Sequence, residues 1–71
     1  MTKSTRDQLL AAITELGAMA PEIRLGQLIA NLATLARGAK VEAVWDAEDE
    51  ELLQAAQRLC ETYRSRQEPA A

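Results

Sequence analysis

The sequence has no histidine and only one cysteine among its 71 residues. A zinc site of the Cys/His type needs several such ligands, so one chain cannot supply it. The same shortage excludes a Ser-His-Asp or Cys-His catalytic arrangement, and a lone cysteine cannot form an internal disulfide. We therefore expect no metal, no cofactor and no disulfide framework.

Large side chains are also scarce. There is no phenylalanine, one tryptophan and one tyrosine, and 14 residues are alanine. A chain of this length buries roughly 60% of its unfolded surface, so its core is marginal. The composition predicts one small domain over residues 1–71, with too little volume for a catalytic pocket that excludes water. We expect no enzyme activity.

Long apolar runs are absent as well. The longest run covers residues 9–13, which is too short for a membrane span or a signal-peptide core. The net charge of −3 argues against non-specific binding of nucleic acid. We expect a cytoplasmic protein that does not contact a membrane and whose partners are proteins rather than nucleic acids.

Apolar residues recur at helical spacing in three segments of the chain. The pattern predicts an all-α, three-helix domain with helices at about 5–17, 21–37 and 46–66. Residues 1–3 and 67–71 are expected to fray. The connection that precedes the third helix is apolar for a loop, and we expect three of its side chains to hold it on the core: Val41, Val44 and Trp45.

Capping residues suggest where the helices begin and end. The first helix can be capped by Thr5 or, in an alternative frame, by Ser4, and Gly17 can end it in the left-handed conformation. Pro21 suits the first position of the second helix, and Gly38, just past Arg37, is expected to end it. Asp46 is a good N-cap for the third.

The second predicted helix carries the strongest apolar stripe in the chain. Beside this stripe lie Gly26, Ala30 and Ala33, and a glycine inside a helix costs about 1 kcal/mol relative to alanine. Close approach of another helix, within the chain or from another subunit, would offset that cost. We therefore expect helix 21–37 to be central, and we expect packing or association to use Leu25, Gly26, Leu28, Ile29, Leu32 and Trp45.

A polar strip on the same helix consists of Arg24, Gln27 and Asn31, at spacings that share one face. These side-chain types can read the edges of DNA bases, and the preceding turn loosely suits a helix-turn-helix. However, the strip has one charge and no flanking basic residues to hold phosphates. A solvated helix face and a contact to a protein partner are the other interpretations.

Acidic residues dominate positions 46–51, where five of six are Asp or Glu. Acids are favoured at the start of a helix, which is the simplest explanation. The alternative is a docking patch for a basic partner, which would use Asp46, Glu48 and Asp49. A calcium loop is excluded because the segment has no turn glycine and no alternating ligand pattern.

Two single residues also have alternative interpretations. Cys60 lies beside an apolar stripe and is expected to be a small core residue rather than a reactive thiol. Trp45 is expected to anchor the core, and the alternative is a hot spot that faces a partner.

Residues 21–31 contain the segment RLGQL, and residues 45–53 read WDAEDEELL. These stretches resemble segments that follow one another in short bacterial proteins to which no activity is attached. They span about half of the chain, roughly residues 21–53. The resemblance implies a bacterial source and implies no activity, cofactor or site residue.

The sequence as a whole favours a small non-enzymatic interaction module that is a homo-oligomer or a subunit of a larger assembly. One alternative is an antitoxin-like DNA-binding regulator that reads DNA with helix 21–37. A second alternative is an acidic inhibitor, or immunity-type protein, that masks a basic partner.

Overall fold

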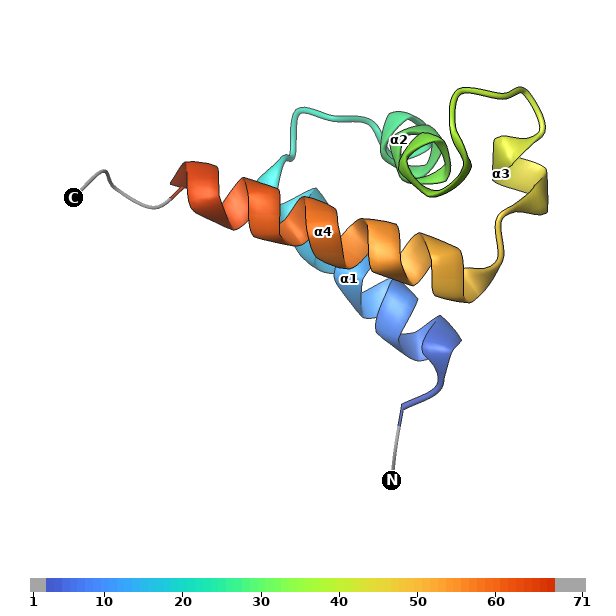
Figure 1. Cartoon of the computed structure of the whole chain (residues 1–71). Coiled ribbons are helices and arrows are strands. Elements are labelled where there is room, and N and C mark those ends of the chain that lie inside the picture. Colours follow the sequence, from blue (N-terminus) through green and yellow to red (C-terminus); the bar gives the residue numbers. More distant parts are fainter. Residues whose placement is uncertain (1–2, 68–71) are drawn as a thin grey trace.

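The computed structural model describes residues 3–67, and none of these residues belongs to a strand. Figure 1 shows the four helices that they form. Their bounds are α1 Thr5–Met19, α2 Leu25–Arg37, α3 Ala43–Asp46 and α4 Asp49–Gln67. The all-α prediction is confirmed, and the three long helices correspond to the three predicted segments. The short helix α3 was not predicted.

The start of α1 follows the second of the two predicted frames. Ser4 is the N-cap, and its hydroxyl oxygen accepts a hydrogen bond from the Asp7 N–H at 3.1 Å. The predicted stop at Gly17 is wrong, because the helix continues to Met19. Gly17 stays helical, and among the described residues only Gly38 has a positive φ, at 90°. Gly38 ends α2 as expected.

The predicted start of α2 at Pro21 is also wrong. The Ile23 N–H donates to the Ala20 carbonyl at 3.1 Å, so Pro21 occupies the second position of a turn. A proline is as well suited to that turn position as to the first turn of a helix. The helix begins at Leu25 instead, after Arg24, whose N–H is bound by the Gln27 side-chain oxygen at 3.1 Å.

The last helix starts later than predicted, because the short helix α3 comes before it. Asp46 ends α3 rather than capping α4, and Ala47 then adopts an extended conformation. At the start of α4 the Glu51 carboxylate accepts the Glu48 N–H at 2.9 Å, which satisfies an otherwise unpaired donor. The expectation that Asp46 is an N-cap is therefore wrong.

The central helix is α4, and the prediction that helix 21–37 is central is wrong. α4 packs against both α1 and α2, whereas α2 packs only against α4 and α3 to any extent. In Figure 1, α2 is viewed almost end-on above α4, and α1 passes behind it. Adjacent apolar pairs give α4 a buried stripe broad enough for two neighbours: Leu52 with Leu53, and Ala55 with Ala56.

Ion pairs show the relative direction of α1 and α4. Arg6 and Asp49, near the two helix starts, are 2.7 Å apart. Glu15 pairs with Arg64 near the two helix ends. The two helices therefore run in the same direction.

The core consists of small and medium side chains. Its largest fully buried side chains are Leu16 and Leu32, and no buried polar residue lies among the described residues. The shortest dimension of the molecule is 19 Å, about two helix diameters, so few residues can be enclosed on all sides. Cys60 is 3% exposed, which confirms that it is a core residue.

The expected fraying of the ends lies mostly outside the described residues, since residues 1–2 and 68–71 are not among them. The described residues in those ranges are Lys3, whose carbonyl accepts a bond from the Gln8 side chain, and Gln67, which is the last residue of α4.

Candidate protein-binding surface

The segment between α2 and α4, residues 38–48, has one buried residue, Ala43. Gly38 turns the chain out of α2, and the Ala43 N–H donates to the Lys40 carbonyl at 3.1 Å. Ala43 then starts α3 and is only 3% exposed. The α3 helix packs against α2, and Ala43 is the only buried residue of its four.

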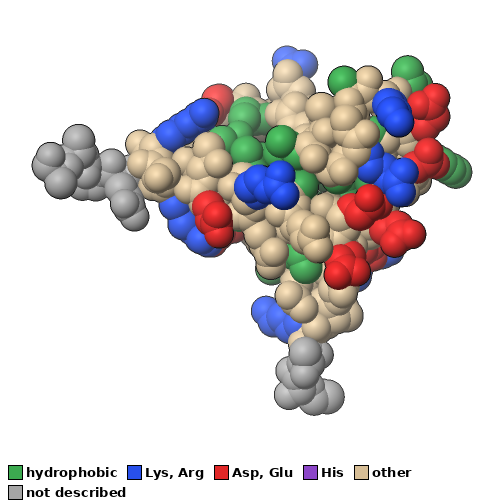
Figure 2. Space-filling view, in the orientation of Figure 1, with side chains coloured by type: hydrophobic (Ala, Val, Ile, Leu, Met, Phe, Trp, Pro, Cys, Tyr) green, Lys and Arg blue, Asp and Glu red, His purple; other side chains and the backbone are tan. Residues whose placement is uncertain are grey.

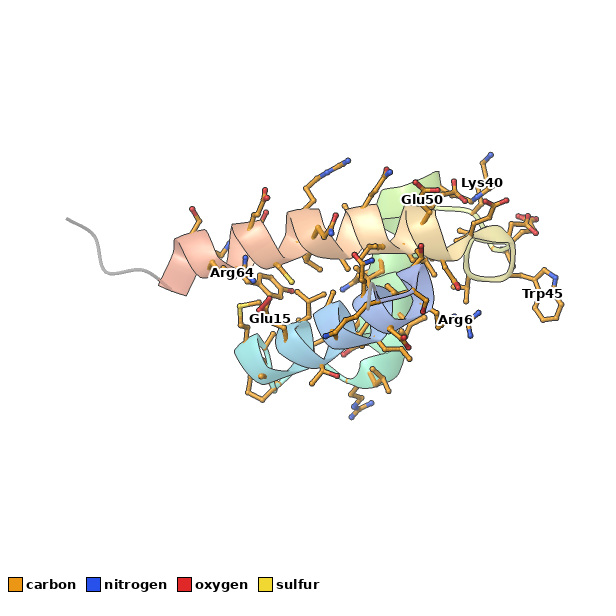
Figure 3. The ribbon with its side chains drawn as sticks, turned by 90° about the horizontal axis from the view of Figure 1, so that it is seen from below. Arg6, Glu15, Lys40, Trp45, Glu50 and Arg64 are labelled. Atoms are coloured by element: carbon orange, nitrogen blue, oxygen red, sulfur yellow. The ribbon has the colours of Figure 1, made fainter. Side chains whose placement is uncertain are left out.

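The large apolar residues of this segment are exposed. Val41 is 96% exposed, Trp45 is 91% exposed and Val44 is 51% exposed. Residues two apart in a helix differ by about 200°, so Trp45 faces away from the side on which Ala43 is buried. Figure 3 shows its indole projecting from α3 away from the rest of the molecule.

The expectation that Val41, Val44 and Trp45 hold the segment on the core is therefore wrong, because Ala43 does so instead. We call the three exposed residues the α3 patch. Trp45 is the only tryptophan of the chain, and no other described large hydrophobic residue except Val41 is as exposed. Tryptophan is one of the residue types enriched at the hot spots near the centres of protein interfaces.

Carboxylates lie on both sides of the α3 patch. Figure 2 shows acidic side chains gathered over the end of the molecule that contains α3 and the start of α4. Four of them are exposed and make no ion pair with any described residue, and we call these the flanking acids: Glu42, Asp46, Glu48 and Glu50.

The other two acids in this region are used within the fold. Asp49 pairs with Arg6, and Glu51 pairs with Arg37 at 3.0 Å. The Glu48 N–H and the Arg37 guanidinium lower the pKa of the Glu51 carboxyl. Of the predicted docking acids, Asp46 and Glu48 are therefore free of ion pairs within the described chain, whereas Asp49 is not.

The predicted polar strip lies elsewhere. Arg24, Gln27 and Asn31 are all exposed, but they lie at the N-cap and in the first seven residues of α2, and α3 follows the other end of that helix. Gln27 also uses its amide oxygen to bind the Arg24 N–H. Because α2 packs on α4 and α3 rather than on α1, the fold adds no support to a helix-turn-helix, and DNA reading stays a prediction.

The predicted association residues of α2 divide between core and surface. Leu28 and Leu32 are 3% and 1% exposed, and Ile29 is half-buried, so they pack inside the chain. Leu25 is 64% exposed. A Cβ added to Gly26 would meet no atom within 4 Å, so the expected close approach at this glycine is wrong within the chain.

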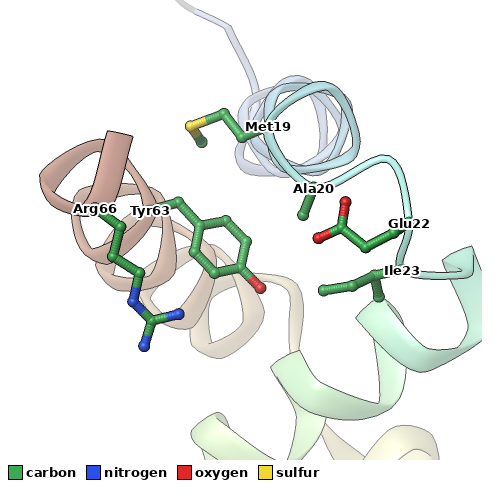
Figure 4. A pocket seen from close by; sticks show the side chains of 6 residues that line it. All are labelled: Met19, Ala20, Glu22, Ile23, Tyr63 and Arg66. Carbon is green, nitrogen blue, oxygen red and sulfur yellow. The ribbon is translucent and has the colours of Figure 1, made fainter. Parts of the chain in front are cut away.

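Two shallow pockets lie near the other end of α4. One has a volume of about 250 Å³ and is shown in Figure 4, where Tyr63 reaches from α4 toward Ile23, with Arg66 and Glu22 on its two sides. The other, about 290 Å³, lies beside Cys60 and the Glu15–Arg64 pair.

The surroundings of the second pocket do not activate the Cys60 thiol. Burial and the nearby Glu15 carboxylate raise the pKa of the Cys60 thiol to about 11, which suppresses the nucleophilic thiolate. Across residues 3–67 there is no group of three or more Cys, Asp or Glu side chains arranged to hold a metal ion. No described helix is both long enough and apolar enough to cross a membrane.

Comparison of the chain with models of protein families, with curated proteins and with solved structures finds no match. The resemblance to short bacterial proteins stays a prediction. The α3 patch and its flanking acids are therefore interpreted from their own geometry.

Proposed function

We propose that this chain is a non-enzymatic protein-interaction module that binds another protein through the α3 patch. The observation that carries the proposal is the 91% exposure of Trp45, next to two exposed valines. The chain has few large side chains, and its core would gain from any of them. Leaving its only tryptophan in water supports a role for that residue outside the fold.

The free energy available at this surface is substantial. An aromatic side chain removes ~150–250 Å² from water when it is buried. At ~25 cal/mol/Å², covering Trp45 contributes about 4–6 kcal/mol before the entropic costs of association. An indole at the centre of an interface can therefore supply a large share of the binding free energy, and neighbouring contacts must supply the rest.

We propose that the chain is a subunit of an assembly with a different protein rather than a homo-oligomer formed through this patch. A two-fold symmetric interface buries the same surface patch of both copies. That arrangement would bring the flanking acids of two copies against each other, and like charges at an interface are strongly unfavourable.

The test is co-purification of the tagged full chain from its own host. We expect wild type to retain a defined protein in stoichiometric amount, and Trp45→Ala to lose it. Leu25→Ala is the matched control, because Leu25 is also an exposed apolar residue but lies at the start of α2. The same yield from wild type and Trp45→Ala, or loss of the protein from Leu25→Ala alone, would contradict the proposal.

A further inference from the structure

The charge around the α3 patch is strongly negative. Residues 40–50 contain five carboxylates and one cation, Lys40. Arg6 neutralises Asp49, but the four flanking acids make no ion pair with any described residue. Any protein that covers the patch must therefore place its own groups beside unpaired carboxylates.

Helix capping explains only part of this charge. Asp49 and Glu50 lie in the first turn of α4, where a carboxylate is stabilising. Asp46 is the last residue of the four-residue helix α3, and Glu42 precedes that helix and makes no side-chain cap bond. Neither carboxylate makes an ion pair with another residue that the structure describes.

We propose that the partner binds with an arginine-bearing segment, an inference that rests on the function proposed above. An arginine guanidinium stacks on the Trp45 indole and pairs with Asp46 or another flanking acid, and an apolar side chain of the partner covers Val44. Arginine fits this combination better than lysine, because its planar group stacks on aromatic faces and loses less hydration when it is buried.

A second copy of this chain is a poor occupant of the same surface. Its own α3 end carries the same acids, so a two-fold contact through this patch would place carboxylates of one copy beside carboxylates of the other. Charge complementarity therefore favours a basic partner over two-fold self-association through this patch.

The experiment is selection of peptides from a displayed random library on the immobilised full chain, with counter-selection against Trp45→Ala. We expect the recovered peptides to be enriched in arginine next to an apolar residue and to bind less tightly as salt is raised. The double variant Asp46→Asn with Glu48→Gln should weaken such a peptide about three- to tenfold. The matched double variant, Glu22→Gln with Glu61→Gln, removes two exposed acids elsewhere and should leave binding unchanged.

The outcomes separate this inference from the proposed function. Peptides that need Trp45 but show no enrichment in arginine, or that bind the Asp46 and Glu48 variant as well as wild type, would overturn the inference and leave the proposed function standing. Peptides that bind without Trp45, or no enrichment at all, would overturn both. A dimer in light scattering that Trp45→Ala dissociates would identify a second copy as the occupant and would also overturn the inference.

Discussion

Replacement of Trp45 by alanine should leave the stability of the fold almost unchanged. The indole is 91% exposed, and substitutions at such surface positions shift the free energy of unfolding by about 0.5 kcal/mol or less. In a domain of this size, 1 kcal/mol corresponds to about 4–8 °C in Tm. We therefore expect Trp45→Ala to melt within about 4 °C of wild type.

Leu32→Ala provides the contrast. Leu32 is 1% exposed in the centre of the core, and such truncations cost about 2–5 kcal/mol. A chain of 71 residues has about 4–10 kcal/mol of stability in total, so this change should remove a large part of it. Leu32→Ala is compared with wild type at a temperature low enough that both remain folded.

The assay is urea unfolding followed by far-ultraviolet circular dichroism, because the helical signal does not depend on the tryptophan. The expected order of midpoints is wild type equal to Trp45→Ala, with Leu32→Ala far below both. A loss of 2 kcal/mol or more in Trp45→Ala would show that the indole is packed in the fold, and it would refute the assignment of Trp45 to a binding surface.

Further substitutions test other parts of the structure. Gly26→Ala should raise the free energy of unfolding by about 0.5–1 kcal/mol in urea melts, because a Cβ meets open space inside a helix; a loss would instead show a close approach. Gly38→Ala should lower it by about 1–3 kcal/mol, because φ is +90°. The Glu48 N–H lowers the pKa of the Glu51 carboxyl in the folded chain. This hydrogen bond therefore stabilises the fold above the unfolded pKa of about 4.3, and the stabilisation is lost as pH falls through the lower folded pKa. Glu51→Gln removes this titration, so the Tm of the variant should fall less in acid than the Tm of wild type. Native Cys60 should react with a thiol reagent at pH 8 far more slowly than in urea, because a pKa of about 11 leaves about one thiolate in a thousand; equal rates would contradict its burial.

Much of the fold could be predicted from local patterns. The periodicity that contains Leu28 and Leu32 located α2, and Gly38 marked its end, because both signals act within a few residues. Pro21 misled the prediction, since a proline fits the first turn of a helix and the second position of a β-turn equally well.

The position of the central helix could not be predicted from the stripe of one helix alone. The small residues beside the stripe of α2 suggested two neighbours for that helix, but a Cβ added to Gly26 would meet no atom within 4 Å. The informative signal was in α4, where Ala55 and Ala56 are buried together and widen its apolar face. Which helices fill two such faces is decided by long-range packing, and the local sequence does not encode it.

The candidate site was predicted in part. The sequence drew attention to Asp46 and Glu48, and both are exposed as a docking role requires. It placed Trp45 in the core because large apolar side chains are usually buried. The direction in which Trp45 points depends on which residue of the four-residue helix α3 packs inward. The small Ala43 is the residue that is buried, so Trp45 points outward.

Site-specific photo-cross-linking from position 45 in living cells tests the central claim most directly. A photoreactive phenylalanine analogue at Trp45 should yield a discrete adduct with one other protein. The same analogue at Thr14, an exposed position on α1, should yield none. Discrete adducts from Thr14 and none from position 45 would contradict the account.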